Sequence, residues 1–488
     1  MTMDMVGEFR TARLGDSRLD ARLMAVVAGL QVNPEASFPA AFPSSAELEA
    51  TYRLLNNARV NPMTVFGAHV TETLLRAAPE PLVRVIMDTT EARFGGEVPR
   101  ACSGILPSNG QGFFIHLAVV TECKQNRPLG VLAYQLLKRS AQRTGPAQRG
   151  SRQADFDRTD KESKRWLDVF DTCFALVGER GVYVTDCESD SYTYLAYVIS
   201  RGGIPVARLK NDREVTLRGD GEAKKIRQWM EGLPAKSHRE VDISRRGKKS
   251  GRRTRSPSSL QKHPPRSGRK ACLDITAQTV VIPRPDHVSN ALPESLTINV
   301  VRAFEPSPPD GEEAVNWLIL TKLPIGTEEE ILVVVDHYKG RWLIEEYNKC
   351  LKSGCALEER QLENEHSMHT ALAILIPIAW GLLRLRSVGR DTPDASAEKA
   401  LTPSQLAVLK AEMSRREAKM RNPKPMLSEN PTAGQVMLGV AALGGHIKSN
   451  GRPGWAVLSR GYQRLLLLEQ GYRLALDRPA AATGGPDM

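Results

Sequence analysis

The sequence predicts an α/β fold in which helices and strands alternate after an initial run of strands. Three apolar, strand-like segments, LVRVIMD, FFIHLAVVT and LGVLAYQLL, follow one another and are joined by connections rich in Gly, Pro and Asn. A helical stretch at residues 160–177 then leads into strand GVYVTD, helix SYTYLAYVIS and strand IPVARLK. The predicted order of elements is three strands followed by a helix, a strand, a helix and a strand. This is the order of a ribonuclease-H-like fold, with a sheet of five strands.

Helical segments are predicted at both ends of the chain. Residues 1–72 carry arginines and asparagines along their helices, a composition that suits phosphate contacts as well as it suits an ordinary charged surface. Residues 392–488 predict helices without strands. The last of these helices carries apolar residues at helical spacing, which could pack against a partner chain or inside the chain: Leu458, Tyr462, Leu465 and Leu466.

A β-rich segment with a basic stretch interrupts the predicted core, which would comprise residues 73–213 and 318–391. Residues 214–317 predict strand-like pieces, which we interpret as an inserted subdomain. Its middle, from Arg245 to Lys270, contains eleven Lys or Arg residues and no acid. This pattern predicts a flexible basic loop, either an unspecialised surface loop or a clamp on a nucleic-acid backbone.

The composition indicates a protein of several domains that favours polyanionic partners. The 488 residues carry a net charge of +11, and 41% of them are hydrophobic. The seven cysteines are scattered without a CxxC pair, which fits a reducing cytosol and shows no zinc site. The N-terminus lacks the apolar stretch of a signal peptide, and the longest apolar run, residues 371–383, is too short to span a bilayer. We therefore expect a cytoplasmic protein that does not bind membranes.

Two aspartates end strands that lie side by side in the predicted order. Asp88 ends the first strand and Asp186 ends the fourth. Either residue alone could equally be a turn residue or a helix cap. Together, two like charges at one sheet edge repel each other unless cations neutralise them. The pair therefore predicts a site for cations.

The segment YKGRWLIEEYNKCLKSG predicts a helix with a polar stripe. At about 100° per residue, four side chains fall on one side of this helix and an apolar face falls on the other. The stripe consists of Tyr338, Arg341, Glu345 and Lys352. It could be a solvated face with ordinary ion pairs. If the helix packs on the sheet, Glu345 adds a third carboxylate, and three such oxygen donors suit Mg²⁺ or Mn²⁺.

The spacing Tyr-x2-Arg-x3-Glu-x6-Lys resembles the signature of DDE-type cut-and-paste transposases, in particular the bacterial class typified by transposon-five transposase. DTT at Asp88 and DCESD at Asp186 are similar to the segments that contain the first and second catalytic aspartates of that class. Further similarity in LGDSRLDARL, ATYRLLNN, NWLILT and GVAALGGHIKSNGRPGWAVL extends over nearly the whole chain.

The resemblance implies a catalytic triad of Asp88, Asp186 and Glu345 that binds two Mg²⁺ ions, for which Mn²⁺ can substitute. It implies DNA contacts by Tyr338, Arg341, Lys352, Trp317, Arg208 and Lys210. Trp317 would stack on a base flipped from the transposon end, unless it is simply a buried strand aromatic. The N-terminal helices would recognise the ends, and the C-terminal helices would form a homodimer in a synaptic complex. Cys187 departs from the arginine that commonly follows the second aspartate in this class.

We therefore expect an enzyme that binds transposon ends, cleaves them by hydrolysis and transesterification, and joins them to target DNA. The hairpin intermediate follows from the resemblance alone. The alternatives are a non-catalytic regulator of transposition and a ribonuclease-H-like nuclease without strand transfer. No Walker loop or dinucleotide fingerprint indicates a nucleotide cofactor. His366 and His369 could bind a metal, but no nearby Cys or His completes a set. The protein would be bacterial and associated with the nucleoid.

Overall fold

The chain folds into two compact units in the computed structural model. Unit 1 comprises Met1–Val83, Thr89–Arg143 and Leu343–Met488, and unit 2 comprises Arg84–Asp88 and Thr144–Trp342. The structure describes residues 5–42, 44–95, 100–106, 110–138, 163–217, 221–243, 249–250, 253–254, 267–362, 364–419, 427–447, 453 and 455–476. The five segments predicted from the sequence therefore do not correspond one to one with the two units.

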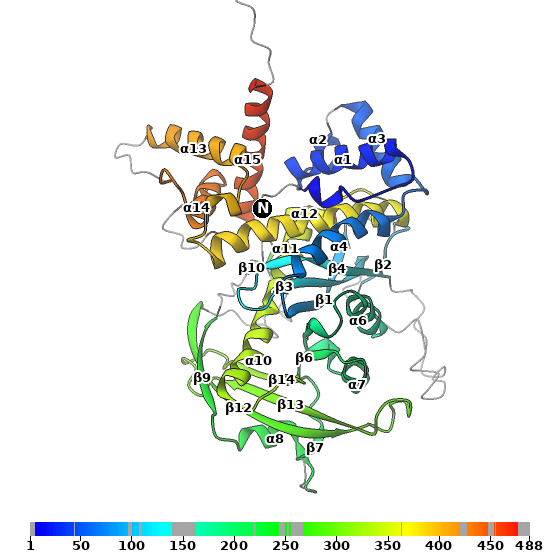
Figure 1. The fold of residues 1–488 in the computed structure, drawn as a ribbon, viewed down its shortest axis with the longest axis vertical. Coiled ribbons are helices and arrows are strands. Elements are labelled where there is room, and N and C mark those ends of the chain that lie inside the picture. Colours follow the sequence, from blue (N-terminus) through cyan, green and yellow to red (C-terminus); the bar gives the residue numbers. More distant parts are fainter. Residues whose placement is uncertain are drawn as a thin grey trace, which may run out of the picture. The chain divides into compact units, whose positions relative to one another are not determined.

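Helices from both ends of the chain build most of unit 1 (Figure 1). They are α1 (Ser17–Val32), α2 (Phe38–Ala41), α3 (Ser45–Asn56), α4 (Pro62–Ala77), α11 (Trp342–Lys349, whose first residue belongs to unit 2), α12 (Glu365–Asp391), α13 (Pro403–Glu417), α14 (Ala433–Leu443) and α15 (Trp455–Leu476). Asp16 and Asn61 are the N-cap residues of α1 and α4, because each side chain accepts a hydrogen bond from a first-turn backbone N–H. The helical character predicted for the two ends of the chain is confirmed.

Helix α12 is the central helix of unit 1. It is long and apolar enough to cross a membrane, but 83% of its most apolar window is buried inside the structure. A helix that is apolar on all sides needs such a covered environment. It packs against α4 and β4 (Pro128–Leu137). The buried helix expected at residues 371–383 is confirmed and extends beyond that run at both ends.

The strands of unit 1 pair around β3 (Gln111–Glu122), which is antiparallel to β2 (Gly104–Ile105) and β4. The later residues of β1 (Val83–Phe94) also belong to unit 1. Both β2 and β4 pair with β3, and β1 is the other neighbour of β3. Gly130 lets α4 approach β4 closely, since a Cβ there would lie 1.8 Å from the Thr73 hydroxyl oxygen.

Unit 2 is built on a mixed sheet. Its strands are the Arg84–Asp88 part of β1, β5 (Gly181–Thr185), β6 (Ile204–Arg208), β7 (Glu214–Leu217), β8 (Lys224–Lys225), β9 (Ser237–Ile243), β12 (Arg269–Pro283), β13 (Ser295–Phe304) and β14 (Asn316–Thr321). They follow the order β1-β5-β6-β14-β13-β12-β7-β8, and β9 also pairs with β12. The predicted adjacency of the first and fourth strands is confirmed, because β1 neighbours β5.

Helices cover this sheet on the two sides of β6 (Figure 1). Helices α6 (Lys164–Val177) and α7 (Tyr192–Ser200) pack against β5 and β6, whereas α10 (Glu328–Gly340) packs against β5, β6, β13 and β14. The short helix α8 (Ile226–Glu231) packs on β12. Strand β5 is buried throughout, as expected of a central strand with helices on both faces. The predicted mixed α/β class is confirmed and is consistent with a ribonuclease-H-like fold.

The predicted sheet of five strands is too small. Strand β14 pairs antiparallel with β6, and β13 and β12 continue the ladder, so strands expected in a separate subdomain extend the same sheet. Of the basic stretch, Lys249–Ser250 (β10) and Arg253–Thr254 (β11) pair with each other, and Arg269–Lys270 begins β12. The other residues of the predicted flexible basic loop lie outside the described part, apart from 267–268.

Candidate active site

Asp88 lies inside β1, not at its end as we predicted. The five residues from Val83 to Met87 are buried, whereas after Asp88 the strand alternates between buried and partly exposed residues as far as Phe94. Such alternation is typical of a strand with one open face. The strand therefore continues past Asp88. Asp88 itself is half-buried and lies where β1 changes from fully buried residues to alternating ones.

Asp186 directly follows β5, as predicted. Its Oδ1 accepts a hydrogen bond of 2.8 Å from the backbone N–H of Glu188, so the carboxylate caps the short 3-10 helix Cys187–Ser189. The Ser189 hydroxyl donates to the Asp186 carbonyl at 3.1 Å and fixes the same turn. Because β1 and β5 are neighbours in unit 2, both aspartates project from adjacent strands.

An aromatic and cationic cluster in unit 2 gathers several of the predicted DNA contacts around the buried Tyr338. The rings of Trp317 on β14 and Tyr338 on α10 meet edge to face with centroids 5.5 Å apart. Burial raises the pKa of the Tyr338 hydroxyl, and the guanidinium groups of Arg341 and Arg208, which hydrogen-bond to it, act in the opposite direction. Tyr338 is only 6% exposed, so it holds the two arginines in place from inside the protein.

Arg208 and Lys210 lie near the turn that carries Asp186. Burial raises the pKa of the Cys187 thiol, the Asp186 charge raises it further, and the charges of Arg208 and Lys210 lower it. The position of Cys187, where the resembled class has arginine, is thus influenced by the charges of one anionic and two cationic side chains. Lys210 itself is exposed.

The predicted stripe from Tyr338 to Lys352 is not one continuous helix face. Helix α10 ends at Gly340, α11 runs from Trp342 to Lys349, and a π-helical turn covers Cys350–Gly354. A π turn places more residues in each turn than an α-helix does, which shifts the side that Lys352 faces. Tyr338 and Arg341 belong to unit 2, whereas Glu345 and Lys352 belong to unit 1, where both are half-buried.

The apolar side of α11 packs inward as predicted. Ile344 and Tyr347 are buried, and the Tyr347 hydroxyl donates a 3.0 Å hydrogen bond to the Ile376 carbonyl of α12. The neighbouring Glu346 pairs with Arg386 of α12. Glu346 therefore anchors α11 to α12.

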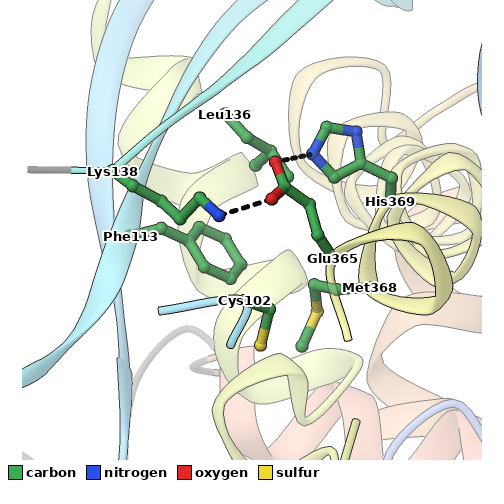
Figure 2. Close-up of a pocket in the computed structure, with 7 residues that line it drawn as sticks. All are labelled: Cys102, Phe113, Leu136, Lys138, Glu365, Met368 and His369. Atoms are coloured by element: carbon green, nitrogen blue, oxygen red, sulfur yellow. Dashed lines mark hydrogen bonds and ion pairs between the residues drawn. The ribbon is translucent and has the colours of Figure 1, made fainter. Parts of the chain in front are cut away.

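No group of three His, Cys, Asp or Glu side chains in the described part is gathered closely enough to hold a metal ion. The two candidate histidines have separate partners: His366 Nε2 lies 2.9 Å from the Asn57 carbonyl, and His369 Nε2 lies 3.9 Å from Glu365. Glu365 also pairs with Lys138 in a small pocket of unit 1 (Figure 2). Its walls are Cys102, Phe113, Leu136, Lys138, Glu365, Met368 and His369.

Two buried polar groups in unit 2 were missed in the sequence. Asp190 accepts hydrogen bonds from the segment after β6, and Arg84 of β1 donates to His337 of α10. The available signals were the second aspartate of DCESD and the arginine inside the apolar run LVRVIMD. Residues four apart on a strand share a face, so Asp88 lies on the face of β1 that Arg84 occupies.

Two protein-family models match the chain. Residues 5–60 match a transposase DNA-binding family, and residues 153–380 match a transposase DDE domain family. Both matched families are transposase families, and together they indicate a DNA transposase with a DDE domain. The second match contains Asp186 and Glu345 and begins after Asp88. The first match covers α1, α2 and α3, so the transposase carries a DNA-binding domain at the N-terminal end of unit 1.

A solved transposase structure is also similar to this transposase. It is a cryo-EM structure of a piggyBac transposase synaptic complex with hairpin DNA, with 10% sequence identity and a TM-score of 0.36. The alignment covers 96% of this chain and 74% of that chain.

Proposed function

We propose that the transposase catalyses cut-and-paste transposition as a member of the class typified by transposon-five transposase. It would bind transposon ends, cleave them by hydrolysis and transesterification with a hairpin intermediate, and join them to target DNA. The observation that carries this proposal is the adjacency of β1 and β5, which brings Asp88 and Asp186 to neighbouring strands. The signature that includes Glu345 supplies the third acid.

Asp88, Asp186 and Glu345 would hold the divalent ions. Their carboxylates are hard oxygen donors of the kind that Mg²⁺ and Mn²⁺ prefer. When bound, two such ions would activate the attacking oxygen and stabilise the leaving oxygen of a phosphodiester. Asp186 is oriented for this role by the N–H of Glu188, which bonds to one carboxylate oxygen.

The cationic side chains would hold the DNA strand beside these acids. Arg208 and Arg341 both act on the pKa of the buried Tyr338 hydroxyl, so the two guanidinium groups are gathered around this side chain before DNA binds. Arginine donates two parallel hydrogen bonds to phosphate, and fixed donors lose little freedom on binding. Lys210 and Lys352 would add charge to the same strand. Trp317, which is half-buried, would stack on a flipped base.

The transposase would work as a homodimer that holds two ends in a synaptic complex. Leu458, Tyr462, Leu465 and Leu466 of α15 are buried inside the chain, so they do not serve as the contact surface. The same helix exposes another apolar set: Leu467, Leu468, Tyr472, Leu474 and Leu476. We propose that these residues pack against a second copy, since exposed apolar patches commonly mark interfaces. The site of action would be the bacterial nucleoid.

The test is metal-dependent cleavage of a duplex that carries the element's terminal inverted repeat, which a search of the flanking genomic DNA would identify. The parent protein should cleave with Mg²⁺ or Mn²⁺ and should transfer the cut end to a target plasmid. Glu345→Gln should lose cleavage while it still binds the duplex. Glu346→Gln is the matched control, because its pairing with Arg386 is structural.

Each other outcome points elsewhere. Cleavage by Glu345→Gln at the parent rate would refute the assignment of the third acid. End binding without cleavage by the parent protein would indicate a regulator of transposition. Cut products without any joining to the target plasmid would indicate a nuclease that lacks strand transfer.

A further inference from the structure

Asp190 is a buried carboxylate four residues after Asp186. Its side chain is fully enclosed, and it ends the short turn that Asp186 begins. Burying a carboxylate is costly unless hydrogen bonds and an opposite charge compensate it. The structure supplies both from a single segment of the chain, the residues that directly follow β6.

The segment Lys210–Arg213 closes around this carboxylate. Oδ2 accepts the backbone N–H groups of Lys210, at 2.6 Å, and Asn211, at 2.8 Å. Oδ1 pairs with the Arg213 guanidinium. The Asn211 side-chain amide donates to the Asp190 carbonyl at 2.9 Å. Asp190 therefore joins the turn after β5 to the segment after β6.

These contacts distinguish Asp190 from a metal ligand. Both of its oxygens already accept from cationic or amide donors, and the side chain has no exposed surface. A group in this state does not reach substrate. It fixes the backbone of Lys210 instead, and Arg208 lies two residues earlier at the end of β6.

We propose that Asp190 is a positioning residue for the transposition reaction. It holds the segment that carries Arg208 and Lys210 at a fixed place beside Asp186, so that phosphates bound by these cations lie in register with the reacting bond. This inference rests on the proposed function. Displacing a positioned group by about 1 Å can cost about 10²-fold in rate, even when binding changes little.

The experiment measures cleavage rate and DNA binding for Asp190→Asn, Lys210→Ala and the double variant, on the terminal-repeat duplex over a series of salt concentrations. Asparagine keeps the shape but replaces one acceptor by an NH2 group, which cannot accept from the donors around it. We expect single-turnover cleavage to fall about 10²-fold at saturating DNA. In the Lys210→Ala background the substitution should have a markedly smaller effect, because part of its action passes through Lys210.

Glu305→Gln is the matched control. Glu305 is another buried carboxylate of unit 2, paired with Arg269 and bonded by the backbone N–H of Val315 at 3.1 Å. The Glu305→Gln variant should have a lower thermal stability, as Asp190→Asn should, but the folded variant should cleave DNA at the parent rate. If Asp190→Asn does not fold, Asn211→Ala tests the same link, since it removes only the 2.9 Å bond to the Asp190 carbonyl.

Equal effects of Asp190→Asn with and without Lys210, or an equal loss in Glu305→Gln, would overturn the positioning role. Parent-like cleavage by folded Asp190→Asn would overturn it as well. Absence of cleavage by the parent protein would instead refute the proposed function, so the two failures are distinguishable.

Discussion

Arg84 of β1 donates a hydrogen bond from Nε to Nδ1 of His337 in α10 at 3.3 Å, and both side chains are buried. The bond requires an unprotonated Nδ1, so this histidine is neutral in the folded protein. Burial lowers the pKa of His337 to about 3, and the charge of Arg84 contributes to this shift. The pair fastens α10, the helix that carries Tyr338, to the strand that carries Asp88.

Acidification should destabilise the protein through His337. In the unfolded chain a histidine binds a proton near pH 6.5, whereas the folded protein excludes it until about pH 3. The unfolded state therefore binds more protons between these values, and the free energy of unfolding should fall by up to about 1.4 kcal/mol per pH unit as pH decreases. Urea unfolding between pH 7 and 5 measures this slope above the range in which most carboxylates titrate.

Replacing the histidine isolates its share of that slope. In His337→Asn the amide oxygen can accept from Arg84, and no titrating group remains. The slope below pH 6.5 should decrease by about 1.4 kcal/mol per pH unit relative to the parent. Burial also lowers the pKa of His69, so part of the slope should persist. The exposed His287 provides the control, as His287→Asn. An unchanged slope in His337→Asn would contradict the expectation.

Trp317→Ala should impair the steps that need a flipped base. Removing the ring eliminates the stacking surface and the edge contact with Tyr338. Stacking of a base on an aromatic ring contributes about 1–3 kcal/mol, which corresponds to roughly 5-fold to 150-fold in the affected step. Fluorescence of 2-aminopurine, placed in turn at each terminal position, should report the loss of flipping. Trp317→Phe should retain most of the signal, and Trp229→Ala should leave it intact.

Arg341→Gln and Lys352→Gln should each weaken DNA binding in a salt-dependent manner. Every phosphate contact that is lost reduces the slope of log K against log salt by about 0.9. Fluorescence anisotropy of a labelled end duplex across a salt series gives this slope. Lys339 is exposed on the same helix as Tyr338 but lies outside the signature, so Lys339→Gln is the control. Equal slopes for all four proteins would contradict phosphate binding by the signature cations.

Cys187→Arg should strengthen binding to end DNA. The substitution restores the cation of the resembled class beside Asp186 and should steepen the salt slope by about 0.9. It should also lower the melting temperature, because the charges of Arg208 and Lys210 already act on this position. Cys187→Ser separates the effect of charge from the loss of the thiol. Affinity equal to that of Cys187→Ser would show that an arginine here does not reach phosphate.

Local patterns predicted much of the fold. The apolar run before Asp186 forms β5, and the neighbouring place of β1 follows from the order of elements. The stripe from Tyr338 to Lys352 was less predictable, since a helical wheel assumes an uninterrupted α-helix. The break after Gly340 and the π turn at Cys350–Gly354 depend on packing that residue spacing does not encode.

Contacts between distant segments were beyond this reasoning. In the sequence, Asp190 cannot be told from an ordinary loop aspartate, because its partner Arg213 is known only from the fold. Similarly, Tyr338 fits a surface position in the sequence, and its proximity to Arg208 of β6 is known only from the fold. Likewise, the antiparallel pairing of β14 with β6 joins segments separated by a long insertion. A charged residue in the middle of an apolar strand, such as Arg84, is the sequence feature that predicts a buried polar partner.

The addition of β14, β13 and β12 beyond β6 changes where this part of the sheet stops. Without them, β6 would present a row of unpaired backbone groups to solvent, and such a border invites strands of other molecules to attach. In the described part, this end of the sheet stops instead at β8, which is two lysines long, and at β9, which carries Arg239, Glu240 and Asp242. Edge strands that carry so many charged residues are poor templates for aggregation, which suits a protein that must stay dispersed until it meets DNA.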